Sequence, residues 1–184
     1  MPLFGQNIPE RLRSRLERGE RVLSQARVAA PAGGVPASDS SEGSADDAVL
    51  VATTRALHLP DGHSVPWQDI DQARWSPDTL TFVEEGAGEH TVRLRTELTG
   101  DPVDYRRFAE TVAERVTSTI LVNRFVPFPD AESATGFRLV ARRAPLGSEI
   151  GWRVHLGEGL DPEDPRLSDA VSRALALLHE QMGV

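Results

Sequence analysis

Apolar and polar residues alternate in several short runs between residues 20 and 96. This two-residue periodicity is typical of strands that bury one face, and turn residues such as Gly, Pro and Asp separate the runs. A succession of short strands predicts an antiparallel meander or barrel. The seven predicted strands cover residues 20–29, 48–53, 56–60, 63–67, 70–75, 79–84 and 90–96.

The turn chemistry between these runs supports the division into strands. The polar residues 53–55 interrupt an otherwise apolar run, at the place where a hairpin turn would put them. Pro60-Asp61-Gly62 predicts the next turn, because Gly62 tolerates a positive φ. Trp67 and Ile70 are out of phase by one position, which predicts a turn or bulge at residues 68–69.

Apolar residues at spacings of three and four predict two longer helices. The first is predicted from a cap at Asp101-Pro102 to about Asn123. The second follows the cap Asp164-Pro165 and stops at Gly183. Two strand-like runs, FRLVARR and IGWRVHL, precede the second helix and predict a ββα unit over residues 136–184. This unit is too small to fold alone, so we expect it to pack on the preceding domain.

The N-terminal segment, residues 1–19, predicts a short amphipathic helix over 8–18, with Ile8, Leu12 and Leu16 on one stripe. Two alternatives are open for it. In the first, the stripe packs on its own domain and its Arg side chains meet the domain's acids. In the second, the basic helix detaches and docks on an acidic partner or a membrane face. Under the second alternative, the candidate partner-binding residues are Arg11, Leu12, Arg15, Leu16 and Arg18.

Charge is distributed unevenly along the chain, and all of the basic residues are Arg. The net charge is −8. Residues 1–30 hold six Arg and three Glu, whereas the remainder holds 14 Arg and 25 acidic residues. An acidic surface disfavours nucleic acid and anionic membranes, so we expect neither as a partner. Residues 31–46 are rich in Pro, Gly, Ser and Ala and carry acids, which predicts a flexible loop.

The sequence lacks the residues and motifs that several kinds of chemistry require. There is no cysteine, so disulfides and thiolate metal ligands are excluded. No apolar run reaches the length of a membrane helix and the N-terminus lacks the apolar core of a signal peptide, which predicts a cytoplasmic protein. No nucleophile elbow, P-loop, dinucleotide or zincin motif occurs. We therefore expect no enzyme, no catalytic residue and no cofactor.

Two histidines and three tryptophans are the remaining candidates for a site. His58 and His63 flank the predicted turn with Asp61 between them and could recruit a metal, although a structural zinc usually has four ligands. We therefore interpret them as two surface histidines beside a turn. The tryptophans stand among apolar neighbours, which predicts that they pack in or beside the core. They are Trp67, Trp75 and Trp152.

Two stretches resemble bacterial pleckstrin-homology-like (PH-like) and GRAM-like domains. LVATTRALHL (residues 50–59) resembles their hairpin, and VPWQDIDQARW (residues 65–75) resembles their strand–turn–strand segment. The tail from Gly136 to Leu167 is similar to the extension of an actinobacterial family with this domain. The resemblance implies an α+β fold. In it, a seven-stranded antiparallel PH-like barrel or sandwich over residues 20–126 ends in a capping helix and carries the appended ββα unit.

The resemblance also suggests how such a protein would work. PH domains that bind phosphoinositides hold the headgroup with basic residues around the loop between their first two strands. Here that loop contains Asp39, Glu42 and Asp46 but no Arg, so phosphate would be repelled. We therefore expect a non-catalytic interaction module with an unidentified protein partner. One alternative is a small-ligand or lipid-binding domain that uses the mouth of the barrel or the seam with the ββα unit. A second and less favoured alternative is an enzyme of unrecognised type.

Overall fold

A computed structural model describes residues 10–29, 48–98, 101–102 and 104–183. The chain divides into two compact units. The first ends at residue 119 and also includes residues 144–146, and the second comprises residues 120–143 and 147–184. Both units combine antiparallel sheets with helices, which confirms the predicted α+β class.

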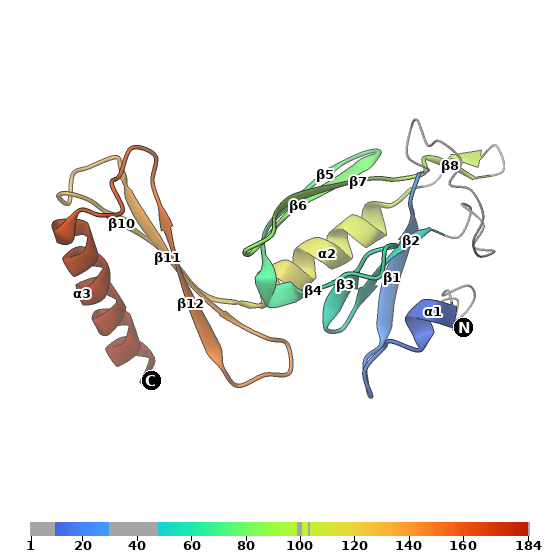
Figure 1. Cartoon of the computed structure of the whole chain (residues 1–184), viewed down its shortest axis with the longest axis horizontal. Helices are drawn as coiled ribbons and strands as arrows, with labels where there is room; N and C mark the ends of the chain where they lie inside the picture. The colour runs from blue at the N-terminus through green and yellow to red at the C-terminus, as the bar shows by residue number, and fades with distance from the viewer. Residues whose placement is uncertain (1–9, 30–47, 99–100, 103, 184) are drawn as a thin grey trace. The chain divides into compact units, whose positions relative to one another are not determined.

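In the described part of the chain, the first seven strands of the first unit form two separate sheets and not one closed barrel (Figure 1). The four-stranded sheet contains β1 (Val22–Arg27), β2 (Val49–Thr53), β3 (Ala56–His58) and β4 (Ser64–Pro66) in that order. The three-stranded sheet contains β5 (Ile70–Ser76), β6 (Thr79–Glu84) and β7 (Gly88–Arg93). An isolated antiparallel bridge between Val28 and Leu94 links the ends of β1 and β7.

The predicted turns between these strands are confirmed. Thr53 closes the β2–β3 turn, because its hydroxyl accepts a hydrogen bond from the Ala56 N–H at 3.0 Å. The phase slip between Trp67 and Ile70 is a single turn of 3₁₀ helix, η2 (Trp67–Asp69). This turn carries the chain from the first sheet to the second, and the fully buried Trp67 donates its indole N–H to the Thr53 carbonyl at 2.9 Å.

Helix α2 (Arg106–Ser118) contacts strands of both sheets and closes the core of the first unit (Figure 1). Its start differs from the prediction, because Asp101-Pro102 forms the short strand β9, which pairs with β8 (Glu97–Leu98). The largest buried side chains of this core are Trp67, Phe82 and Phe108.

The second unit is βββα, so the predicted ββα unit was one strand short. Its antiparallel sheet contains β10 (Ile120–Pro127), β11 (Gly136–Arg143) and β12 (Ile150–Leu156), and helix α3 (Pro165–Met182) follows. The prediction that a helix continues to Asn123 was wrong, since α2 ends at Ser118. Val116 and Ile120 happen to continue the helical spacing, but the β-branched and aromatic residues after them favour a strand.

Helix α3 begins and ends where the sequence predicts. The Asp164 carboxylate accepts the Arg166 N–H at 2.9 Å, Pro165 occupies the first turn, and Gly183 ends the helix with a φ of 70°. The helix lies along one face of the sheet (Figure 1). Its apolar side packs there on a core whose buried residues are Phe128, Phe137, Leu139, Leu167 and Leu178.

Three further predictions concern segments outside these elements. In the described part of the predicted N-terminal helix, only α1 (Glu10–Arg13) is helical, and residues 14–19 form turns and a bend, so the longer helix was wrong there. A short helix is marginal without packing, which explains its early end. The predicted loop 31–46 lies outside the described residues. Packing of the second unit on the first stays a prediction. No helix among the described residues is long and apolar enough to cross a membrane.

Candidate functional site

The five candidate residues of the N-terminal segment do not share one role. Arg11 lies in α1, Leu12 and Leu16 are half-buried, and Arg18 is exposed. Arg15 is exposed as well, but its Nη1 donates a hydrogen bond to the Gly62 carbonyl oxygen at 3.1 Å. This segment therefore uses one of its basic side chains within its own unit.

A buried carboxylate fastens the end of this segment to the first sheet. Glu20 accepts hydrogen bonds from the Thr53 hydroxyl, from the Glu17 N–H at 2.9 Å and from His58 Nε2 at 2.9 Å. Burial opposes ionisation of Glu20, but the hydrogen bonds from Thr53 and His58 outweigh it and lower the pKa of this carboxyl. An ion pair between Glu17 and Arg55 adds a second connection. These contacts favour the alternative in which the segment packs on its own domain.

His58 and His63 do not converge on a common point. The interpretation of His58 as a surface residue was wrong, because it is only 4% exposed and its ring bridges Glu20 and Ser64. His63 instead approaches the carboxylate of Glu84. Among the described residues, no three His, Cys, Asp or Glu side chains are arranged to hold a metal ion.

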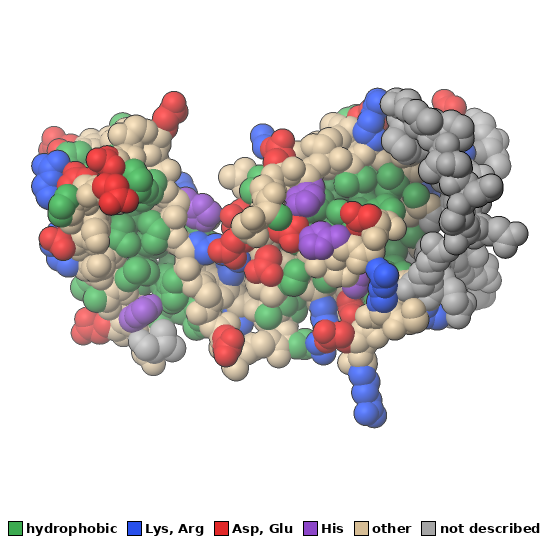
Figure 2. Space-filling model, in the orientation of Figure 1, with side chains coloured by type: hydrophobic (Ala, Val, Ile, Leu, Met, Phe, Trp, Pro, Cys, Tyr) green, Lys and Arg blue, Asp and Glu red, His purple; other side chains and the backbone are tan. Residues whose placement is uncertain are grey.

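A second cluster of histidines surrounds Glu84 at the end of β6. His63 Nε2 lies 2.9 Å from both carboxylate oxygens, and His90 Nε2 lies 2.8 Å from Oε2. The His90 ring also stacks on Phe82, with 4.8 Å between the ring centroids. Figure 2 shows histidine and acidic side chains side by side on the surface of the first unit. This cluster connects the chain before β4 with β6 and β7, which is a structural role.

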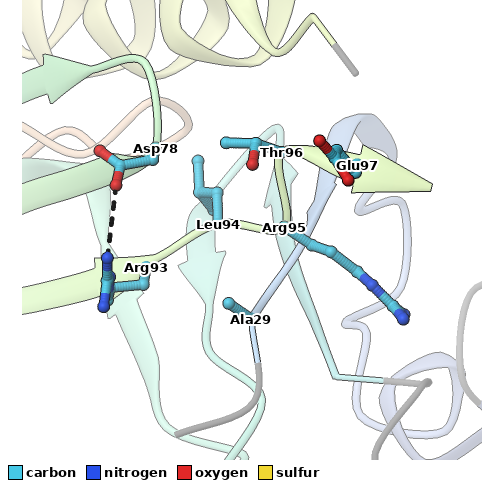
Figure 3. Close-up of a pocket in the computed structure, with 7 residues that line it drawn as sticks. All are labelled: Ala29, Asp78, Arg93, Leu94, Arg95, Thr96 and Glu97. Atoms are coloured by element: carbon cyan, nitrogen blue, oxygen red, sulfur yellow. Dashed lines mark ion pairs between the residues drawn. The ribbon is translucent and has the colours of Figure 1, made fainter. Parts of the chain in front are cut away.

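A hollow of about 520 Å³ lies beside the end of β7. Its lining has both signs of charge, and Arg93 and Asp78 form an ion pair at 3.6 Å (Figure 3). The Arg95 side chain extends away from this pair (Figure 3). Because acids balance the arginines, the hollow offers little net attraction to a charged ligand. The lining residues are Ala29, Asp78, Arg93, Leu94, Arg95, Thr96 and Glu97.

The sheet of the second unit has a face that points away from α3. Cross-strand pairing aligns two rows of side chains on this face. Phe125, Arg138 and His155 form one row, and all three are exposed. Asn123, Val140 and Arg153 form the other row, in which Val140 is buried and Arg153 is half-buried. We call Asn123, Phe125, Arg138, Arg153 and His155 the open-face patch. Alternate residues of the same strands, such as Val122, Phe137 and Trp152, pack toward α3, so the patch lies opposite the helix.

Contacts within the open-face patch hold a guanidinium group in place over an aromatic ring. The Arg138 guanidinium carbon lies 5.9 Å from the centroid of the Phe125 ring, and Nη1 donates to Asn123 Oδ1 at 2.8 Å. Phe125 is 42% exposed, which is unusual for so large an apolar side chain. The patch thus combines apolar area with oriented hydrogen-bond donors, as interface hot spots do.

The sequence prediction missed the open-face patch. Its members are far apart along the chain, and only the strand register brings them together. A signal was present in β11 and β12, where Arg138, Arg153 and His155 alternate with apolar residues and therefore share one face. Without β10, however, the aromatic member of the row was absent from the predicted sheet.

Comparison with known proteins assigns this chain to no family. No protein-family model matches it, and neither a curated protein nor a solved structure is significantly similar.

Proposed function

We propose that this chain is a non-catalytic interaction module that binds a protein partner through the open-face patch. The observation that carries the proposal is the row formed by Phe125, Arg138 and His155, with the Arg138 guanidinium stacked on an exposed aromatic ring. The ring supplies area that is favourable to bury, and the guanidinium supplies hydrogen bonds suited to a carboxylate. The proposed partner is an acidic peptide segment that also carries an apolar side chain.

Charge complementarity is the reason for an acidic partner. The exposed row of the patch holds Arg138 and His155 beside Phe125 and contains no carboxylate. The second unit as a whole has seven Arg and nine acidic residues, so the basic charge of this face is opposite in sign to the net charge of the unit. The net charge of −8 repels polyanions at long range, which favours a short acidic peptide over a nucleic acid.

A PH-like scaffold is the finer fold that we propose for the first unit. Four strands in one sheet precede three in a second, and β1 meets the end of β7 at Val28 and Leu94. The amphipathic helix α2 comes after these seven strands, separated from β7 by the short pair β8 and β9, and contacts both sheets. This order supports the resemblance of residues 50–75 to bacterial PH-like and GRAM-like domains.

The test is a titration with a defined probe, a fluorescent peptide that alternates Asp or Glu with Phe and Leu. A matched peptide replaces the acids with Lys. We expect the acidic peptide to bind in a salt-sensitive manner, with amide NMR shifts confined to residues 121–125, 138–140 and 153–155. Arg138→Glu and Phe125→Ala should each weaken binding by about tenfold or more, the effect of losing a hot spot.

The matched control is Arg173→Glu, which makes the same charge change at an exposed position on α3. We expect this variant to bind as the unaltered protein does. If Arg138→Glu and Arg173→Glu weakened binding equally, the binding would depend on net charge alone, which would contradict a specific site. If a single-stranded oligonucleotide or phosphoinositide vesicles bound at these residues instead, the proposal that the ligand is a protein would be wrong. Shifts confined to residues 93–97 would instead support the second candidate function, binding of a small ligand in the hollow of Figure 3.

A further inference from the structure

Three side chains of the first unit form a hydrogen-bonded series that the proposed function does not use. Ser64 Oγ lies 2.7 Å from His58 Nδ1, and His58 Nε2 lies 2.9 Å from Glu20 Oε1. The side chains of His58 and Glu20 are 5% and 3% exposed. Ser64 is an exposed residue. The series therefore connects a buried carboxylate, through an imidazole, with a hydroxyl at the surface.

The carboxylate determines which nitrogen of the neutral imidazole carries the proton. Glu20 can only accept, so His58 Nε2–H donates to it, and Nδ1 keeps a lone pair that accepts the Ser64 hydroxyl proton. Glu20 is itself held by the Thr53 hydroxyl and by the Glu17 N–H. In this arrangement, His58 is the base that faces the hydroxyl, and Glu20 is a positioning residue.

Strand pairing fixes the geometry between base and hydroxyl. His58 on β3 and Ser64 on β4 are direct cross-strand partners in the antiparallel register. Their backbone positions are therefore set by the sheet and do not depend on a loop. A hydroxyl, an imidazole and a carboxylate in this order are the groups that activate a serine toward an acyl carbon.

We infer that Ser64 is an activated nucleophile and a site of covalent acylation by small, activated acyl donors such as acyl phosphates and aryl esters. Ser64 Oγ forms a bond to the carbonyl carbon of the donor while its proton passes to His58 Nδ1. The bond between that carbon and the leaving oxygen breaks, and the phosphate or phenolate departs with the electron pair. The proton on His58 then passes to the leaving group or to water, and the product is an ester at Ser64.

The position of Ser64 explains the choice of donor. Ser64 does not line the hollow beside β7, so no cavity described above would enclose a larger substrate. A donor with a good leaving group needs less help from the protein in expelling it. This inference goes beyond the proposed function, because the open-face patch belongs to the other unit.

The absence of cysteine from the sequence permits a direct test that leaves the buried residues unchanged. Ser64→Cys introduces a single thiol next to His58, and Ser148→Cys places one at an exposed position between β11 and β12. We expect iodoacetamide to alkylate the Ser64→Cys protein about tenfold faster at neutral pH, because an adjacent imidazole stabilises the thiolate. Equal rates in the two variants would overturn the inference.

The natural serine is tested with a fluorophosphonate probe and with p-nitrophenyl acetate, followed by peptide mass mapping. We expect label on Ser64, none in Ser64→Ala, and unchanged labelling in Ser148→Ala. Glu20→Gln should slow acylation and alter its pH profile while the protein remains folded by circular dichroism. A merely structural Glu20 would leave the pH profile unchanged, and this result would remove it as a positioning residue. Failure of the unaltered protein to acquire label at Ser64 would overturn the inference.

Discussion

The two units of this protein cover their sheets in different ways. In the first unit, two sheets and α2 enclose one core, which contains Trp67, Phe82 and Phe108. In the second unit, α3 covers a single face of a three-stranded sheet. Among the described residues, six large apolar side chains are exposed, and all except Leu146 belong to the second unit. The comparison shows that the first unit buries its large apolar side chains almost completely, whereas the second leaves several of them exposed.

The largest expected effect is in the enclosed core of the first unit. Trp67→Ala removes a fully buried indole and leaves the Thr53 carbonyl without its donor. We expect the free energy of unfolding to fall by about 3–5 kcal/mol, measured by urea titration with far-UV circular dichroism. Trp152→Ala, at a half-buried position in the second unit, should cost less. If Trp67→Ala destabilised the protein less than Trp152→Ala, the conclusion that the first unit has the more completely enclosed core would be contradicted.

Two neighbouring leucines on α3 allow a matched test of the helix-covered face of the second unit. Leu178 is 7% exposed and packs on the sheet, whereas its neighbour Leu177 is 59% exposed. We expect Leu178→Ala to destabilise the protein by about 2–3 kcal/mol and Leu177→Ala by less than about 0.5 kcal/mol. Thermal unfolding of the two variants side by side measures this. Similar losses would show that a further contact covers Leu177.

Glu20 gives the first unit a pH-dependent contribution to stability. Its pKa in the folded protein is lowered below its ordinary value of 4.5. The contribution is therefore complete above about pH 4.5 and declines as the pH falls through the lower folded value. We expect Glu20→Gln to cost about 1–2 kcal/mol at pH 7 and less at pH 3, as measured by denaturant unfolding. The exposed control Glu158→Gln should have little effect at either pH.

The smallest expected effect on stability is at the open-face patch. Phe125→Ala removes a side chain that is already 42% exposed, together with its stacking on Arg138. We expect the free energy of unfolding to change by no more than about 0.5–1 kcal/mol, while the proposed peptide binding weakens by about tenfold or more. Differential scanning calorimetry checks the first expectation. A loss of several kcal/mol would mean that Phe125 packs against the protein itself and does not serve a partner.

Local patterns were sufficient to predict most strands of the first unit. Each depends on alternation over a few residues and on the turn residues between runs, such as Pro60-Asp61-Gly62. Closure into a barrel could not be predicted in this way, because it depends on which distant strands pair. Only the bridge between Val28 and Leu94 links β1 to β7 in the described part of the chain.

The sites were harder to predict than the strands, since they depend on strand register. His58 was interpreted as a surface residue because it stands beside a turn, but Leu57 and Leu59 on either side of it signalled a buried strand. The contact of His58 with Glu20 joins segments that no local pattern connects. Strand β10 was missed because its first residues continue the apolar spacing of α2. The pairing of Phe125 on β10 with Arg138 on β11 was missed for the same reason.

Strand β12 pairs only with β11 among the described residues, so the backbone groups on its other edge have no strand partner there. Such an edge is a template for ordered aggregation, and Val154 and Leu156 on this strand are more than a third exposed. Arg153 and His155 alternate with them and disfavour stacking of like strands through charge. Substitutions that make β12 more apolar are therefore expected to increase aggregation through this edge.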